Sequence, residues 1–346
     1  MKIGILTFHK TDNYGAMLQA YALSYYLKKL GHTVCFIDYC PAYVYKKHFI
    51  KKTTIDKIKE YIKNLVCYNL KRIKNERFSK FVSSYMQTIL ISEVPNLDLV
   101  IIGSDQVWNT CLTNYDSYYM GQGIDCKKIV SYAVSCGNLS DIDDRTSLLY
   151  KNCLNKLDSI SVREWSAKVI LDNLLDKNCK QTLDPTLLVD NIVFRKIHKK
   201  PEFGNYILIY DATNPDILNF AEKIAKQNGK NVVAISCDIA MKNRDKLIQD
   251  ASVEEFLGYI ANADLIISTS FHGCALSLSY KKNFYCINTG GIASRSAELL
   301  DLFGLSERFI DVHADVTITH IDYEKVGIKW NKLRYESEEF LSNCIK

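Results

Sequence analysis

The sequence lacks the features of a membrane-spanning or secreted protein. Among its 346 residues no stretch approaches the roughly 18 uninterrupted apolar residues that a membrane helix needs. The N-terminal run MKIGILTF is followed by HK and then by TDNYGA, without the small-residue cleavage site of a signal peptide. The twelve cysteines are scattered singly and no two have CxxC spacing, which indicates reduced thiols rather than a disulfide framework. These absences predict a cytoplasmic protein.

Several signatures of enzyme chemistry are absent as well. The chain has no GxGxxG fingerprint and no Walker A loop, so a dinucleotide site or a P-loop has little support. It has no HExxH segment and no cysteine or histidine pairs at zinc-site spacing. It also lacks the GxSxG segment of serine hydrolases. We therefore expect no metal and no other cofactor.

What is present is typical of a globular protein with two domains. The length is sufficient for two lobes that each bury a core. The hydrophobic content of 47%, the charged content of 24% and only five prolines argue against extensive disorder. We expect the whole chain to fold.

The net charge of +5 is distributed unevenly. Residues 46–80 carry twelve Lys and Arg against three acidic residues, a surplus of nine, so the rest of the chain is mildly acidic. Tyrosines and phenylalanines lie within and beside this stretch. Such a surface could face a nucleic acid, a membrane surface or an acceptor that bears a diphosphate. The alternative is a solvated helical face.

The first half of the chain begins with a βαβ pattern. Residues 2–8 read as a strand, residues 15–30 as a helix that ends before Gly31, and residues 33–39 as a second strand. Further short apolar runs follow at residues 98–103, 128–135 and 159–162. In open parallel sheets ligands collect at the carboxyl ends of strands, so the residues directly after each run are the ones of interest.

A second alternating series follows a looser segment at residues 184–201, where we place the interdomain link. Ser252 and Glu255 have the spacing of a capping box at a helix start. The expected strands cover residues 206–210, 231–237, 264–269 and 284–288, and the last expected helix covers residues 294–303. The pattern predicts an α/β fold with two Rossmann-like doubly wound domains that face a cleft. We assign residues 1–190 to the first domain, with a basic helical insertion at about 41–90, residues 200–325 to the second, and residues 326–346 to a C-terminal helix.

Two candidate segments lie in the first predicted domain after strands. The loop HKTDNYG at residues 9–15 could contact a donor or acceptor through Asp12, Asn13 and Tyr14, or could be a plain turn. The segment GSDQVWN at residues 103–109 presents Asp105, Gln106, Trp108 and Asn109. Asp105 is suited to act as a general base and the Trp108 ring to stack on a sugar. The alternative is a turn with Trp108 in the core.

Two further segments carry cations. In SVRE, Arg163 could bind a carboxylate or phosphate in a bidentate manner, whereas the alternative is a pair with Glu164 at the protein surface. In STSFHG, a strand ends and a helix starts, so Ser270 and His272 lie where an anion is favoured and where a proton can be transferred. Arg295 opens another helix and could add a second cation.

The ordered set of segments NYGAMLQAYAL, GSDQVWN, SYAVSCG, SVRE, LDPTLLV and STSFHG resembles the polysaccharide pyruvyl transferase family over about residues 1–310. Members of this family look like GT-B glycosyltransferases in fold and move pyruvate from phosphoenolpyruvate onto a sugar as a ketal. The segment SYAVSCG departs from the family pattern at Val134 and Cys136, and we assign Cys136 no role.

The resemblance implies a role for each candidate residue. Arg163 would hold phosphoenolpyruvate together with Ser270 and Arg295, His272 would contact the phosphate or donate a proton, and Asp105 would be the base toward the sugar. The implied acceptor contacts are Asp12, Asn13, Tyr14, Gln106, Trp108 and Asn109. The implied partners are phosphoenolpyruvate and a sugar acceptor, with a lipid diphosphate and the inner membrane face expected beside residues 46–80, and no nucleic acid.

Two other readings of the sequence stay open. A nucleotide-sugar glycosyltransferase has the same two-domain architecture, because one fold serves many chemistries. A non-catalytic glycan- or nucleic-acid-binding module would use the basic stretch and would not depend on His272.

Overall fold

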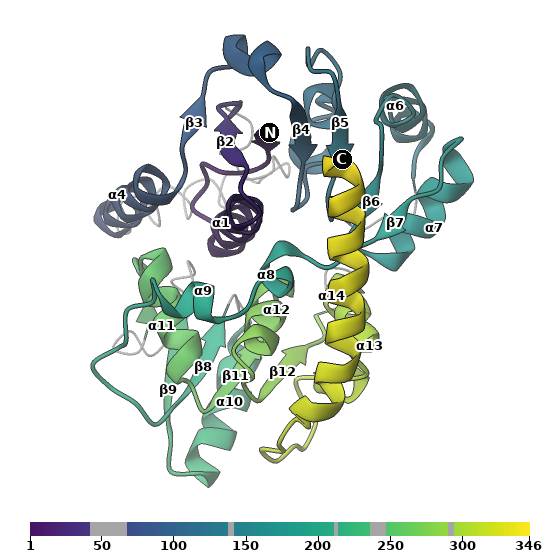
Figure 1. The fold of residues 1–346 in the computed structure, drawn as a ribbon. Coiled ribbons are helices and arrows are strands. Elements are labelled where there is room, and N and C mark those ends of the chain that lie inside the picture. The colour runs from purple at the N-terminus through teal and green to yellow at the C-terminus, as the bar shows by residue number, and fades with distance from the viewer. Residues whose placement is uncertain (42–67, 138–141, 211–213, 236–246, 290–293) are drawn as a thin grey trace, which may run out of the picture. The chain divides into compact units, whose positions relative to one another are not determined.

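The computed structural model describes residues 1–41, 68–137, 142–210, 214–235, 247–289 and 294–346 (Figure 1). The chain divides into two compact units. Unit 1 comprises Met1–His48, Phe81–Val189 and Lys329–Lys346, and unit 2 comprises Phe49–Lys80 and Asp190–Ile328. The expectation of a cleft between the two lobes stays a prediction.

Unit 1 is built on a parallel sheet with the strand order β3-β2-β1-β4-β5. Its strands are β1 (Lys2–Leu6), β2 (Thr33–Ile37), β3 (Thr88–Ile89), β4 (Leu99–Ile102) and β5 (Ile129–Ser131). The chain moves outward from β1 to β2 and β3, then returns to the other side of β1 with β4. Because parallel crossovers are right-handed, this reversal puts helices on both faces of the sheet.

Unit 2 repeats the arrangement with one more strand, in the order β10-β9-β8-β11-β12-β13. Its strands are β8 (Tyr206–Tyr210), β9 (Asn231–Ile235), β10 (Leu247–Ile248), β11 (Leu265–Ser268), β12 (Phe284–Ile287) and β13 (Phe309–Ile310). All the recorded pairings in this sheet are parallel. The two strand orders confirm the predicted fold class of two Rossmann-like, doubly wound halves.

Helix α1 (Tyr14–Lys29) follows β1 directly. The Asn13 side chain caps its start by accepting a hydrogen bond of 3.1 Å from the Ala16 backbone N–H. Its last residue is Lys29, Leu30 is the C-cap, and Gly31 follows with a positive φ of 89°. The predicted helix is therefore confirmed, with each end one residue earlier than expected. Most of α1 is buried, including the polar residue Gln19.

The rest of unit 1 contains short elements around the sheet. They are the helices α5 (Thr110–Thr113), α6 (Asp144–Leu154), α7 (Trp165–Leu174) and α8 (Pro185–Leu188), and the 3₁₀ helices η1 (Ile91–Asn96) and η2 (Ser117–Met120). Two short strands, β6 (Ser161–Val162) and β7 (Lys180–Gln181), pair in parallel. A bridge between Val134 and Val162 continues the strand pattern from β5 to β6. Arg163 therefore follows a strand end, as Asp105 does.

The helices of unit 2 are α9 (Ile192–Arg195), α10 (Pro215–Gln227), α11 (Val253–Asn262), α12 (Phe271–Ser279) and α13 (Ser294–Phe303), with the 3₁₀ helix η5 (Ser306–Arg308). Two of them, α10 and α11, start with clear local signals. At α11, Ser252 and Glu255 form the predicted capping box, with bonds of 3.2 and 2.9 Å. At α10, Asn214 caps a helix whose buried side packs on β8 through Ile217, Phe220 and Ile224.

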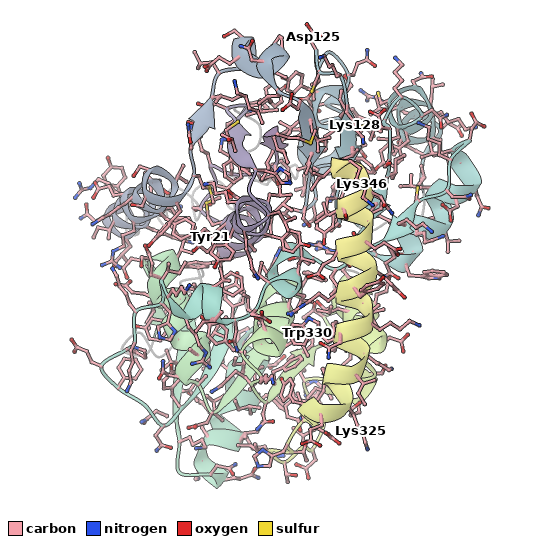
Figure 2. The ribbon with its side chains drawn as sticks, in the orientation of Figure 1. Tyr21, Asp125, Lys128, Lys325, Trp330 and Lys346 are labelled. Carbon is pink, nitrogen blue, oxygen red and sulfur yellow. The ribbon has the colours of Figure 1, made fainter. Side chains whose placement is uncertain are left out.

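Two longer helices complete the described chain. In the predicted basic helical insertion at about 41–90, residues 42–67 lie outside the described residues and helix α4 (Tyr68–Tyr85) follows them. The end of this range is not helical, because Thr88–Ile89 forms β3 of the unit 1 sheet. Helix α14 (Tyr323–Ile345) carries Trp330, labelled in Figure 2, whose indole N–H donates to the Leu187 carbonyl at 2.8 Å. Within the described residues, no helix is both long and apolar enough to cross a membrane.

We predict that Gly273→Ala destabilises the protein by about 1–3 kcal/mol. A Cβ atom at this position of α12 would lie 2.1 Å from Ser268 Oγ and 2.9 Å from the Tyr210 ring, so the helix could not keep its close approach to β11 and β8. The measurement is the free energy of unfolding in urea. The matched control is Gly327→Ala in α14, where a Cβ meets nothing within 4 Å and should stabilise by about 0.5–1 kcal/mol. Equal effects of the two substitutions would contradict the prediction.

Candidate active site

Polar segments follow the strands at which each sheet reverses its order. In unit 1 the reversal lies between β1 and β4, and in unit 2 between β8 and β11. Open parallel sheets bind ligands outside the carboxyl ends of the strands at this point. Asp105 follows β4, and His272 follows β11. The strand order therefore distinguishes GSDQVWN and STSFHG from the other segments, and HKTDNYG, which follows β1, adjoins the first of them.

A chain of hydrogen bonds joins the ends of β1 and β4. The Thr7 hydroxyl donates to the Ser104 carbonyl at 2.9 Å and accepts from Gln19 Nε2 at 3.0 Å. The same Gln19 nitrogen donates to the Ala16 carbonyl at 3.0 Å. All of these side chains are buried in unit 1. The side chain of Gln19 is thereby fixed at the sheet reversal.

Asp105 is placed by an irregular strand end. Gly103 has a φ of 108°, and a Cβ there would lie 2.5 Å from the Tyr132 carbonyl oxygen, so only glycine fits. Asp105 itself has a φ of 70°, a strained value for a residue other than glycine, and strain of this kind often marks a functional position. Its Oδ1 accepts a hydrogen bond from the Gln106 backbone N–H at 2.8 Å, and the residue is 8% exposed to solvent.

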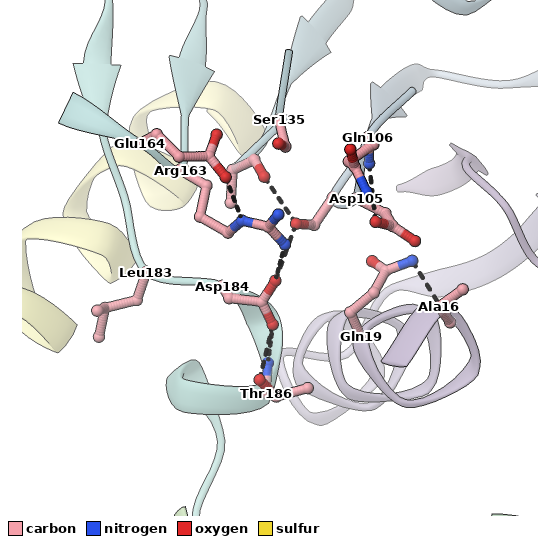
Figure 3. A network of polar contacts seen from close by, with 12 residues as sticks. Ala16, Gln19, Asp105, Gln106, Ser135, Arg163, Glu164, Leu183, Asp184 and Thr186 are labelled. Carbon is pink, nitrogen blue, oxygen red and sulfur yellow. Dashed lines mark hydrogen bonds and ion pairs between the residues drawn. The ribbon is translucent and has the colours of Figure 1, made fainter. Parts of the chain in front are cut away.

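Arg163 lies in a buried network of ion pairs (Figure 3). Its Nε donates to Glu164 Oε1 and its Nη1 to Asp184 Oδ2, both at 2.9 Å. The predicted alternative, a pair with Glu164, is thus present, although it is internal and shared with Asp184. The remaining Asp184 oxygen accepts from the backbone N–H and the hydroxyl of Thr186. Whether Arg163 also binds a donor stays a prediction.

The electrostatics of Arg163 follow from its neighbours. Burial by itself would lower the pKa of the guanidinium, but the surrounding carboxylates outweigh burial and raise that pKa. These carboxylates belong to Glu164, Asp184 and Asp105. One cation among three carboxylates leaves this end of the sheet with an excess of hydrogen-bond acceptors.

Several predicted acceptor contacts have structural roles. Trp108 is fully buried and its indole N–H donates to the Tyr119 carbonyl at 2.9 Å, so its ring lies in the core, the alternative that the sequence left open. Asn109 caps α5 and donates to Gln106 Oε1 at 3.0 Å, while Asn13 caps α1. Tyr14 is buried and Asp12 is exposed. A fully buried ring cannot stack on a sugar, so the predicted role of Trp108 is wrong. The contact of the other residues with a sugar stays a prediction.

In unit 2, His272 lies in the first turn of α12 and is 7% exposed to solvent. The N-cap residue Ser270 makes no side-chain capping bond; instead, its own N–H donates to Ser268 Oγ at 3.0 Å. In this nine-residue helix the N–H groups of the first turn project outward from the N-terminal end, and the Ser270 side chain does not cap them. This is the geometry of an anion site. Arg295 is the second residue of α13 and half-buried.

Sequence reasoning missed Gln19 and Asp184 as parts of the site in unit 1. Asp184 precedes Pro185, a pattern that indicates a helix start, and it does cap α8. Nothing in the sequence indicates that the same carboxylate binds Arg163. Gln19 is a polar residue on a buried helix face, which is the signal that could have identified it. Within the described ranges, no three His, Cys, Asp or Glu side chains group as a metal site.

The fold defines an α/β protein of two Rossmann-like halves, with polar segments at the reversal of each sheet. The family model for polysaccharide pyruvyl transferase matches residues 13–291, which covers most of the chain and both sheet-reversal segments. The chain belongs to the polysaccharide pyruvyl transferase family. A comparison with curated proteins found no match.

Two solved structures resemble the chain at low sequence identity. A UDP-GlcNAc 2-epimerase from Methanocaldococcus jannaschii is 13% identical, with 96% of this chain and 92% of that chain covered and a TM-score of 0.44. A heptosyltransferase from E. coli is 14% identical, with 83% and 88% covered and a TM-score of 0.39. Similarity at TM-scores under 0.5 does not identify a shared activity.

We predict that Asp184→Asn destabilises the protein by about 3 kcal/mol, because it removes one carboxylate from a buried cation while the isosteric amide keeps its oxygen for capping α8. The measurement is the free energy of unfolding in urea. The matched control is Glu76→Gln, which breaks an exposed pair with Arg72 and should change stability by less than about 0.5 kcal/mol. A loss of under about 1 kcal/mol for Asp184→Asn would contradict this prediction.

We predict that His9 makes the protein less stable in acid. Its Nδ1 lies 3.1 Å from the Thr7 carbonyl, and burial lowers the pKa of its imidazole below the ordinary 6.5. In the unfolded chain the imidazole binds a proton near pH 6.5, whereas in the folded chain it binds one only at lower pH. The free energy of unfolding therefore falls as the pH drops through 6.5. The slope contributed by this one group is at most about 1.4 kcal/mol per pH unit.

The measurement is urea unfolding between pH 7.5 and 5.5. His9→Asn keeps a donor for the Thr7 carbonyl and should flatten the loss of stability, whereas His313→Asn at an exposed histidine should not. Identical pH profiles for His9→Asn and the parent protein would contradict the prediction.

Proposed function

We propose that the protein transfers pyruvate from phosphoenolpyruvate onto two hydroxyls of a sugar in a cell-surface polysaccharide precursor, as a ketal. The observation that carries this proposal is the family match over residues 13–291, which includes Asp105 and His272 at the reversal points of their sheets. We propose that no metal or other cofactor takes part, because the chemistry requires only an acid, a base and an anion site.

In this reaction two sugar hydroxyls add to the donor carbon and phosphate leaves. The methylene carbon of phosphoenolpyruvate takes a proton, and one sugar hydroxyl adds to the neighbouring carbon as it loses its own proton. Phosphate then leaves with the electrons of its C–O bond, and a second hydroxyl adds to the resulting cation and loses its proton. The products are the ketal and inorganic phosphate, which accounts for every atom of the reactants.

In this proposal His272 donates the proton to the methylene carbon or contacts the phosphate. Its place in the first turn of α12 supports the assignment, because the first-turn N–H groups and the helix dipole favour an anion there. Asp105 accepts the proton of a sugar hydroxyl. Its support is a carboxylate at the sheet reversal with one oxygen already fixed by the Gln106 N–H. We assign Arg163 to the donor, with Ser270 and Arg295 as further donor contacts.

We further propose that the protein acts in the cytoplasm, where its acceptor is linked to a lipid diphosphate at the inner membrane face. The support is the charge of residues 46–80, with twelve basic residues against three acidic ones. In the described part of this stretch, α4 carries basic residues at Lys71, Arg72 and Lys80 on its exposed surface.

We predict that the protein, given phosphoenolpyruvate and a panel of lipid-linked galactosides, releases phosphate and adds the mass of a pyruvate ketal. His272→Ala should lower the rate about 10²–10⁴-fold, the usual contribution of a general acid or base. Phosphate release and mass spectrometry are the measurements. His313→Ala, an exposed histidine of the same unit, is the control and should leave the rate unchanged.

Two outcomes would contradict the proposal. One is the absence of a ketal product across the panel together with thermal stabilisation by UDP or GDP but not by phosphoenolpyruvate, which would favour a nucleotide-sugar glycosyltransferase. The other is an unchanged rate in the His272→Ala variant.

A further inference from the structure

Gln19 has a buried carbonyl oxygen that no described group satisfies. The residue is fully buried in the middle of α1, and its amide nitrogen donates to both Thr7 Oγ1 and the Ala16 carbonyl. Since the Ala16 carbonyl can only accept, the amide cannot be turned over without losing that bond. The oxygen Oε1 therefore points to the other side, where it has no hydrogen-bond partner in the described part of the chain.

A buried acceptor of this kind destabilises the fold unless a donor reaches it. In Figure 3 the oxygen of the Gln19 amide is turned toward Arg163 and Asp184. The bonding links Gln19 to the end of β4, because Gln19 holds the Thr7 hydroxyl that in turn donates to the carbonyl of Ser104, the residue before Asp105. Gln19 Oε1 is thus an acceptor at the sheet reversal of unit 1.

The groups gathered at this place define the ligand they would take. Gln19 Oε1 and the Asp105 carboxylate are acceptors, and the cation Arg163 is already bonded to the carboxylates of Glu164 and Asp184. A ligand that satisfies both acceptors at this sheet reversal brings two O–H donors. A pair of sugar hydroxyls has this chemistry.

We propose that Gln19 is a specificity-determining residue for the acceptor, and that its Oε1 accepts a hydrogen bond from the sugar hydroxyl adjacent to the one that Asp105 engages. The inference rests on the proposed function for the identity of the two hydroxyls as the pair that the ketal joins. Thr7 is a positioning residue, because it contacts the sugar only through Gln19. Sugars that lack one hydroxyl of the pair leave Oε1 without a donor and bind less well.

The test compares parent sugars with their deoxy analogues. Saturation-transfer NMR measures the binding of methyl galactoside, glucoside and mannoside, each with its mono-deoxy analogues, to the full chain with and without phosphoenolpyruvate. The wild type should bind one parent sugar about tenfold more tightly than one of its deoxy analogues. Gln19→Met, which keeps the side-chain length but has no carbonyl, should bind the two equally. Thr7→Val should reduce the ratio as well.

The matched control is Ser24→Ala in the same helix. Ser24 is buried and its hydroxyl also has no hydrogen-bond partner among the described residues, but it has no recorded bond to Thr7. Its variant should keep the wild-type ratio. Because the readout is a ratio of two sugars on one protein sample, a partly unfolded variant does not alter it.

Every other outcome contradicts either this inference or the proposed function. The inference is wrong if no sugar binds the wild type, or if Gln19→Met keeps the wild-type ratio for every analogue. In that case Oε1 accepts a hydrogen bond from a structural water instead of a sugar. If the ratio changes as expected but no ketal forms with any acceptor, the proposed function fails while the sugar site remains. If the ketal forms but Gln19→Met leaves the ratio unchanged, only the inference fails.

Discussion

The parallel pairing of β1 with β4 is the constraint on which the rest of unit 1 depends. In its register Ile3 lies opposite Leu99 and Leu6 opposite Ile102, so both strands end at the same edge of the sheet. The Thr7 hydroxyl can therefore reach the Ser104 carbonyl. A slip of one residue would turn each side chain of the strand to the opposite face and break this contact. The positions of Asp105 and Gln19 follow from this one register.

The buried charges at the same edge form a second constraint. Asp184 caps α8 through one oxygen and binds Arg163 through the other, which ties the helix to the end of β6. With three carboxylates around one guanidinium, this edge is rich in acceptors. In unit 2 the first turn of α12 is instead rich in N–H donors. Under the proposed function, Asp105 in the first set activates the hydroxyl, and both Arg163 and the first turn of α12 bind the donor anion.

Local signals in the sequence predicted much of the fold. The helix expected over residues 15–30 runs over Tyr14–Lys29, and the strand expected over residues 206–210 is β8. The capping box of Ser252 and Glu255 forms as predicted. Each of these features depends on residues within a few positions of one another, so apolar periodicity, caps and glycines report them directly.

The candidate site was less predictable, because its decisive contacts join distant parts of the chain. The pairing of Arg163 with Asp184 and the contact of Thr7 with Ser104 leave no trace in local spacing. The same holds for Trp108, whose burial depends on what packs around it. An aromatic or charged residue after a strand can equally be a ligand contact or part of the core.

The sequence by itself determined the alternation of strands and helices, the segments that end strands, and the residue types at those ends, because these depend on periodicity and capping over short distances. Only the tertiary structure decided which strand ends lie together, because the order β3-β2-β1-β4-β5 arises from packing between residues far apart in the chain. That order turned Asp105 and His272 from two candidates among several into the residues at the reversal of each sheet. It also assigned Arg163 to buried carboxylates and left the Gln19 oxygen as an acceptor without a hydrogen-bond partner among the described residues.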